Sequence, residues 1–119
     1  MKLLADAFVA LVALLHVYFL VLEMFLWKKP FGRRTFGLTR EMAEATASLA
    51  ANQGLYNGFL AAGLIWGLSL GAAGLSIKVF FLVCVIIAGI FGAATANRRI
   101  LWVQAVPGAL ALALVLLAR

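Results

Sequence analysis

The sequence predicts an all-α protein, a single polytopic membrane domain built as a four-transmembrane-helix bundle. Hydrophobic residues make up 66% of its 119 residues and charged residues only 12%, a balance typical of integral membrane proteins. The apolar residues gather in four stretches of about 20, the length that an α-helix needs to cross a bilayer. We expect one transmembrane domain over residues 1–119, with helices over about 4–27, 50–74, 77–96 and 100–118 and a basic connection over about 28–49.

The first stretch contains Glu23, the only acidic residue well inside an apolar part of the chain. A carboxylate in hydrocarbon costs several kcal/mol unless it is protonated, paired or next to water, so such a residue predicts a functional site. The stretch is longer than the apolar region of a signal peptide, and no small-x-small cleavage site precedes Trp27. We therefore expect this helix to remain in the mature protein.

The basic connection has two parts. Residues 28–38 contain Pro30, Gly32 and Gly37, which predict an irregular basic turn. Thr39 is suited to cap a helix that begins there and runs directly into the second span.

The last three spans are joined by short connections near residues 74–76 and 97–99, which predict antiparallel neighbours. Gly63, Gly67 and Gly71 recur every four residues and predict close approach between helices. This spacing suits packing within the monomer, in a homo-oligomer, or both.

The basic residues indicate how the bundle is oriented. Seven of them lie in the first and third connections: Lys28, Lys29, Arg33, Arg34, Arg40, Arg98 and Arg99. Only Lys2, Lys78 and Arg119 belong to the other side. This asymmetry predicts a chain in a bacterial inner (plasma) membrane with both termini outside the cytoplasm. Because the basic residues flank apolar spans, their expected partners are membrane lipids and not nucleic acid.

Polar residues are concentrated in the cytoplasmic third of the predicted bundle. Helical spacing places His16 and Glu23 on one face of the first span and an arc of polar residues at the start of the second. Together with an amide on the fourth span, these residues predict a polar pocket for a small amphiphilic or lipid-like ligand. The candidate ligand-binding residues are His16, Glu23, Asn52, Gln53, Tyr56, Asn57 and Gln104.

The same residues carry a resemblance to a known family. Residues 16–27 read His-x-x-Phe-x-x-Leu-Glu-Met-Phe-Leu-Trp, and residues 51–63 read Ala-Asn-Gln-Gly-Leu-Tyr-Asn-Gly-Phe-Leu-Ala-Ala-Gly. With Phe80-Phe81-Leu82-x-Cys84-Val85, residues 88–95 (Ala-Gly-x-x-Gly-Ala-x-Thr) and Gln104-x-x-Pro107, they make the chain resemble the integral membrane family called domain of unknown function 1304. The resemblance implies the fold and supplies no reaction.

No catalytic or cofactor motif accompanies the site. GxGxxG, P-loop and HExxH sequences are absent, so we expect no cofactor and no metal, and an enzyme ranks below the other classes of function. His16 and Glu23 lie about 10.5 Å apart along a helix axis, too far for a direct hydrogen bond. Both residues could instead have a structural role, since each could form a hydrogen bond with a neighbouring helix without touching a ligand.

Three classes of function remain. The first is binding of a small amphiphile near Glu23, and the second is proton-coupled transport. In size and in its first-helix glutamate the chain resembles small multidrug-resistance exporters, but those often form antiparallel dimers with weak charge bias. The third class is an enzyme or a structural subunit of a membrane complex. Ligand binding is the prediction that we carry forward.

Overall fold

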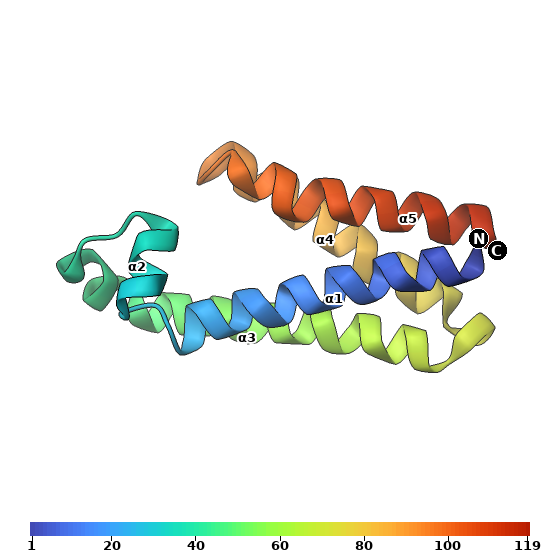
Figure 1. The fold of residues 1–119 in the computed structure, drawn as a ribbon, viewed down its shortest axis with the longest axis horizontal. Helices are drawn as coiled ribbons and strands as arrows, with labels where there is room; N and C mark the ends of the chain where they lie inside the picture. Colours follow the sequence, from blue (N-terminus) through green and yellow to red (C-terminus); the bar gives the residue numbers. More distant parts are fainter. The chain divides into compact units, whose positions relative to one another are not determined.

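The computed structural model describes all residues from Met1 to Arg119. Its elements are α1 (Lys2–Met24), α2 (Pro30–Phe36), α3 (Arg40–Ser69), the 3₁₀ turn η1 (Gly71–Gly74), α4 (Leu75–Thr95), the π-helical turn η2 (Leu101–Ala105) and α5 (Val106–Ala118) (Figure 1). Every regular element is helical, which confirms the all-α prediction. The chain divides into unit 1, residues 1–15 and 60–119, and unit 2, residues 16–59.

Three segments are long and apolar enough to cross a membrane: Lys2–Met24, Gly71–Thr95 and Leu101–Ala118. The long helix α3 has 30 residues, but Asn52, Gln53, Tyr56 and Asn57 interrupt its apolar sequence. Length and composition therefore support a membrane protein with three candidate spans.

Unit 2 contains a short helix where an irregular turn was predicted, so that part of the prediction is wrong. Pro30 occupies the first turn of α2, where its fixed φ suits a helix and its missing N–H has no partner to lose. Gly37 ends the helix with φ 65°, the left-handed conformation that glycine adopts most readily. The Leu38 N–H donates back to the Arg33 carbonyl at 2.9 Å, which satisfies the helix end.

The predicted start of the next helix is confirmed. The hydroxyl Oγ1 of Thr39 accepts a hydrogen bond from the Met42 backbone N–H at 3.1 Å, and α3 begins at Arg40.

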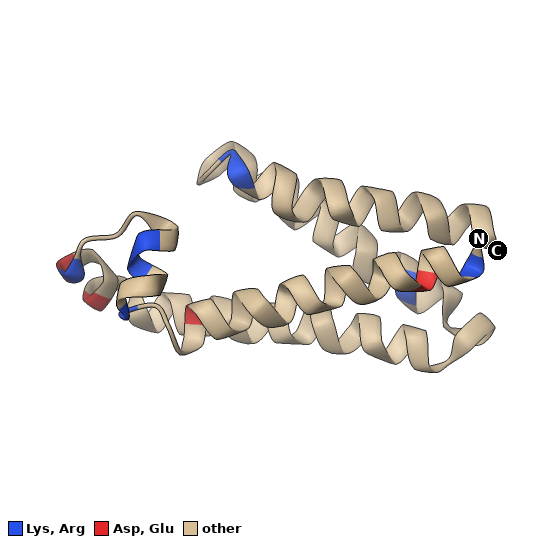
Figure 2. Ribbon diagram, viewed as in Figure 1, with Lys and Arg blue, Asp and Glu red and all other residues tan.

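Within the same unit, the Trp27 indole Nε1–H donates to Thr46 Oγ1 at 3.0 Å, and its ring packs on Phe36. The connection between α1 and α3 is thus tied to α3. Basic residues cluster on and around α2, whereas Lys78 is the one charged residue on α4 and α5 (Figure 2).

The apolar core of unit 1 is formed by one face of each of its helices. On α1, Ala5, Val9 and Val12 follow helical spacing and are almost fully buried. They belong to a cluster with Leu64 of α3 and with residues of α4 and α5, namely Leu82, Val85, Ala111 and Val115.

Glycines decide how closely α3 and α4 approach within unit 1. A Cβ on Gly63 would lie 2.4 Å from the ring of Phe81, and one on Gly67 would lie 2.6 Å from Cγ of Lys78. These pairs run in opposite directions along the two helices, as the short connection predicted. Gly71 was also predicted to allow close approach between helices, but it takes no part in this contact. It lies beyond α3 with φ 59°, and a Cβ there would meet nothing within 4 Å.

Helices α4 and α5 are also antiparallel. A Cβ on Gly89 would lie 2.8 Å from the Ala105 nitrogen, and a Cβ on Gly108 would lie 3.0 Å from Val85. The fourth predicted helix begins as the π-helical turn η2, in which the Val106 N–H bonds to the Leu101 carbonyl five residues back. Pro107 follows immediately and has no N–H to donate, which is consistent with a local change of helical bonding.

Candidate functional site

The side chains of Glu23 and Asn57 meet in unit 2. Asn57 Nδ2 donates a hydrogen bond to Glu23 Oε1 at 2.5 Å, joining the last turn of α1 to the middle of α3. Asn57 is 9% exposed and Glu23 is half-buried. The expectation that a nearby amide or hydroxyl would satisfy Glu23 is confirmed for Asn57.

Two glycines on α3 allow this contact. A Cβ on Gly54 would lie 3.1 Å from the Glu23 Cβ and 2.7 Å from Cγ of Met24. A Cβ on Gly58 would lie 2.7 Å from Cδ1 of Leu20. These glycines are four residues apart and flank Asn57, so the two helices approach closely at the position of the hydrogen bond.

The chemistry of the pair follows from its donors and acceptors. An ionised carboxylate only accepts hydrogen bonds, so the amide nitrogen of Asn57 must be the donor. This arrangement leaves the second oxygen of Glu23 and the side-chain oxygen of Asn57 as acceptors. The pair can therefore recognise a group that donates hydrogen bonds or carries positive charge.

The other polar residues of α3 lie elsewhere on the helix surface. Asn52 and Gln53 are exposed, and Tyr56 is 54% exposed with its ring packed edge-on against Phe59. Of the four α3 residues predicted to line the site, Asn57 is the one that bonds to Glu23. A helix can direct only part of a polar arc of about 140° towards one neighbour.

His16 and Gln104 have partners of their own. His16 is fully buried, and its ring lies 5.2 Å from that of Phe19 in an edge-on arrangement. Gln104 belongs to unit 1, where its Nε2 donates to the Val85 carbonyl at 3.1 Å and joins η2 to α4. This bond gives Gln104 a structural role, while its predicted role in ligand binding stays a prediction.

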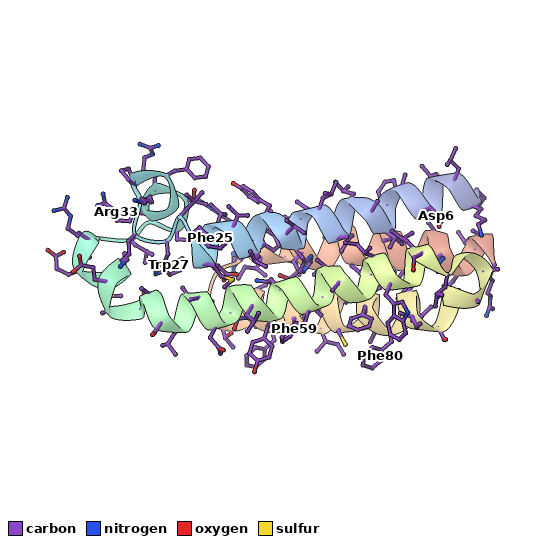
Figure 3. The ribbon with its side chains drawn as sticks, turned by 90° about the horizontal axis from the view of Figure 1, so that it is seen from below. Asp6, Phe25, Trp27, Arg33, Phe59 and Phe80 are labelled. Atoms are coloured by element: carbon purple, nitrogen blue, oxygen red, sulfur yellow. The ribbon has the colours of Figure 1, made fainter.

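Two features of the site were absent from the sequence prediction. Gly54 and Gly58 have the same four-residue spacing that singled out Gly63 and Gly67, so the same signal was present nine residues earlier in the chain. The bond from Trp27 to Thr46 was not expected, because Trp27 alone resembles an interfacial anchor. Figure 3 labels Trp27 and also Arg33, which belongs to α2.

Comparison with known proteins agrees with the resemblance noted in the sequence. The family described as "Protein of unknown function (DUF1304)" matches residues 10–116, which include both Glu23 and Asn57. The chain belongs to this family. This DUF1304 chain is also similar to "Uncharacterized protein YpaA" of Lactococcus lactis subsp. lactis (strain IL1403), with 33% identity over 96 residues, 79% of this chain and 81% of the relative. No solved structure matches this DUF1304 chain.

Proposed function

We propose that this protein binds a small amphiphile in the membrane, with the polar end of the ligand at Glu23 and Asn57. The hydrogen bond between these side chains carries the proposal, because it joins the two residues and leaves the second oxygen of Glu23 and the side-chain oxygen of Asn57 as acceptors. A protonated amine can donate hydrogen bonds to both acceptors. The ligand class is therefore an amphiphile with an ammonium group, its hydrocarbon part lying along the helices.

The proposal includes four transmembrane helices, with α3 as the fourth. Gly54 and Gly58 pack against the end of α1 in unit 2, while Gly63 and Gly67 pack against α4 in unit 1. One continuous helix of 30 residues joins these positions, a length of about 45 Å that exceeds a hydrocarbon core of about 30 Å. With α3 crossing, both termini lie outside the cytoplasm, and the basic residues near α2 and those at Arg98 and Arg99 all lie inside.

Cysteine labelling tests this topology. Cys84 is the chain's single cysteine, so a Cys84→Ala background allows Arg34→Cys, Ala73→Cys and Arg119→Cys to be labelled one at a time in whole cells. We expect a membrane-impermeant maleimide to reach Ala73→Cys and Arg119→Cys but not Arg34→Cys. Labelling of positions 34 and 73 from the same side would show that α3 does not cross and would end the four-span proposal.

Binding is tested by the thermal stability of the purified protein in a neutral detergent. A long-chain primary alkylammonium should raise Tm in a saturable way, whereas its quaternary analogue, which has no N–H, should bind less tightly. Glu23→Gln should weaken binding of the primary alkylammonium by about tenfold, the loss expected for one charge-assisted hydrogen bond. Glu41→Gln is the matched control, because Glu41 is an exposed carboxylate in the first turn of α3.

The same variants separate binding from a purely structural role. If Glu23 only accepts the bond from Asn57, Glu23→Gln should be mild, Glu23→Ala should lose stability, and no alkylammonium should stabilise the protein selectively. That result would contradict ligand binding. Proton-coupled transport would instead appear as pH-dependent uptake of the alkylammonium into proteoliposomes that Glu23→Gln abolishes while the protein stays folded.

A further inference from the structure

A second polar group lies inside unit 1, far along the sequence from Glu23. Lys78, in the first turn of α4, is only 6% exposed. Its Nζ lies 3.7 Å from Oδ1 of Asp6. Figure 3 labels Asp6, near the start of α1. This distance is longer than a hydrogen bond, so the ion pair leaves the three N–H donors of the ammonium available to other acceptors.

The fold accommodates the lysine side chain specifically. Its hydrocarbon stem passes over Gly67 of α3, where any larger residue would collide with Cγ. A buried ammonium is costly unless a charge and hydrogen-bond acceptors surround it. Asp6 supplies a charge but is itself 37% exposed at its side chain, so it compensates the ammonium only in part.

Lys78 lines a cavity of about 410 Å³. Lys2, Lys78 and Arg119 form its basic lining, and Asp6 is the one acidic residue. Leu75 and Val115 are among its apolar walls. A cavity of this volume with a few charged groups and an apolar wall is typical of a ligand site.

We propose that this cavity binds the phosphate headgroup of an anionic membrane lipid, with Lys78 as the central contact. The basic lining selects a negative charge, and the apolar wall suits the first part of an acyl chain. The cavity lies where α1 and α4 begin and α5 ends, the level at which spanning helices meet lipid headgroups. This inference concerns unit 1 and does not rest on the proposed amine site.

Native mass spectrometry of the full chain tests the proposal. The protein in neutral detergent is mixed with phosphatidylglycerol or with phosphatidylcholine of the same acyl chains. Wild type should retain one phosphatidylglycerol more strongly than phosphatidylcholine, and an excess of inorganic phosphate should not displace it. Equal retention of the two lipids would overturn the proposal. Binding of inorganic phosphate with no preference for phosphatidylglycerol would assign the cavity to free phosphate and reject the lipid.

Variants locate the site. Lys78→Gln should lower phosphatidylglycerol retention by about tenfold. Asp6→Asn should raise it, because the cavity then has no negatively charged side chain to repel the phosphate, and a purely structural ion pair would not produce this gain. Lys28→Gln, a change at an exposed lysine outside the cavity, is the control and should leave retention unchanged. If Lys78→Gln fails to fold, Asp6→Asn decides: unchanged or weaker retention would contradict the proposal.

Discussion

Gly74→Ala is expected to destabilise the protein by about 3 kcal/mol, a large effect for one methyl group. The Cβ of alanine would collide with the backbone carbonyl of Gly67, since it would lie 1.9 Å from that oxygen. Backbone atoms cannot rotate away as a flexible side chain can, so the end of α3 and the start of α4 must separate. Thermal unfolding in detergent measures the loss.

The control for this prediction is Gly71→Ala in the same turn. Gly74 has φ −89°, which alanine tolerates, so its cost should come from the collision alone. Gly71 has φ 59° and nothing within 4 Å of a Cβ, so its cost of about 1–2 kcal/mol should come from backbone conformation alone. A Gly74→Ala protein as stable as Gly71→Ala would show that the two backbones are not in close contact.

Gly67→Leu should destabilise the protein more than Leu68→Ala, although the second change removes more apolar surface. A side chain at position 67 would meet Cγ and the backbone nitrogen of Lys78 and then Ile77. We expect a loss of about 3 kcal/mol from this overpacking. Leu68 is only partly buried against the core, so its truncation should cost about 1–2 kcal/mol, less than for a fully buried leucine.

Comparison of the two unfolding midpoints in the same detergent checks this order. Equal midpoints would remove close packing as the reason for glycine at position 67. Gly67→Leu should also displace the stem of Lys78, so its retention of phosphatidylglycerol should fall, whereas Leu68→Ala should retain the lipid as wild type does.

The neighbourhood of Glu23 illustrates how far sequence reasoning reaches. Composition and helical spacing identified Glu23 as a carboxyl that needs a partner and identified a set of polar residues that could provide one. Selection of Asn57 from that set depended on the rotation of α3 about its axis. Gly54 and Gly58 set this rotation, because α1 comes closest to α3 at these two positions, where α3 carries no side chain.

Elsewhere too, features set by neighbours in the chain were predictable, whereas contacts between distant residues were not. The Thr39 cap was predictable because it involves residues three apart in the chain. The helix α2 was read as a turn, because its 7 residues are too few for a periodic pattern even though Pro30 and Gly37 mark both ends. Lys78 was counted only as an orienting charge, because nothing near it in the chain reveals that Gly67 and Asp6 lie beside it.

The sequence by itself determined the all-α class, the apolar helices, the start of α3 after Thr39 and the family, because these depend on composition and on neighbours within a few residues. Tertiary structure alone decided that Asn57 bonds to Glu23, that Gln104 bonds to the Val85 carbonyl, and that Lys78 is buried beside Asp6. Each of these contacts joins residues at least 19 positions apart, and their meeting depends on helix rotation and separation. Glycine contacts between helices set both quantities, and no local pattern specifies which glycine meets which partner.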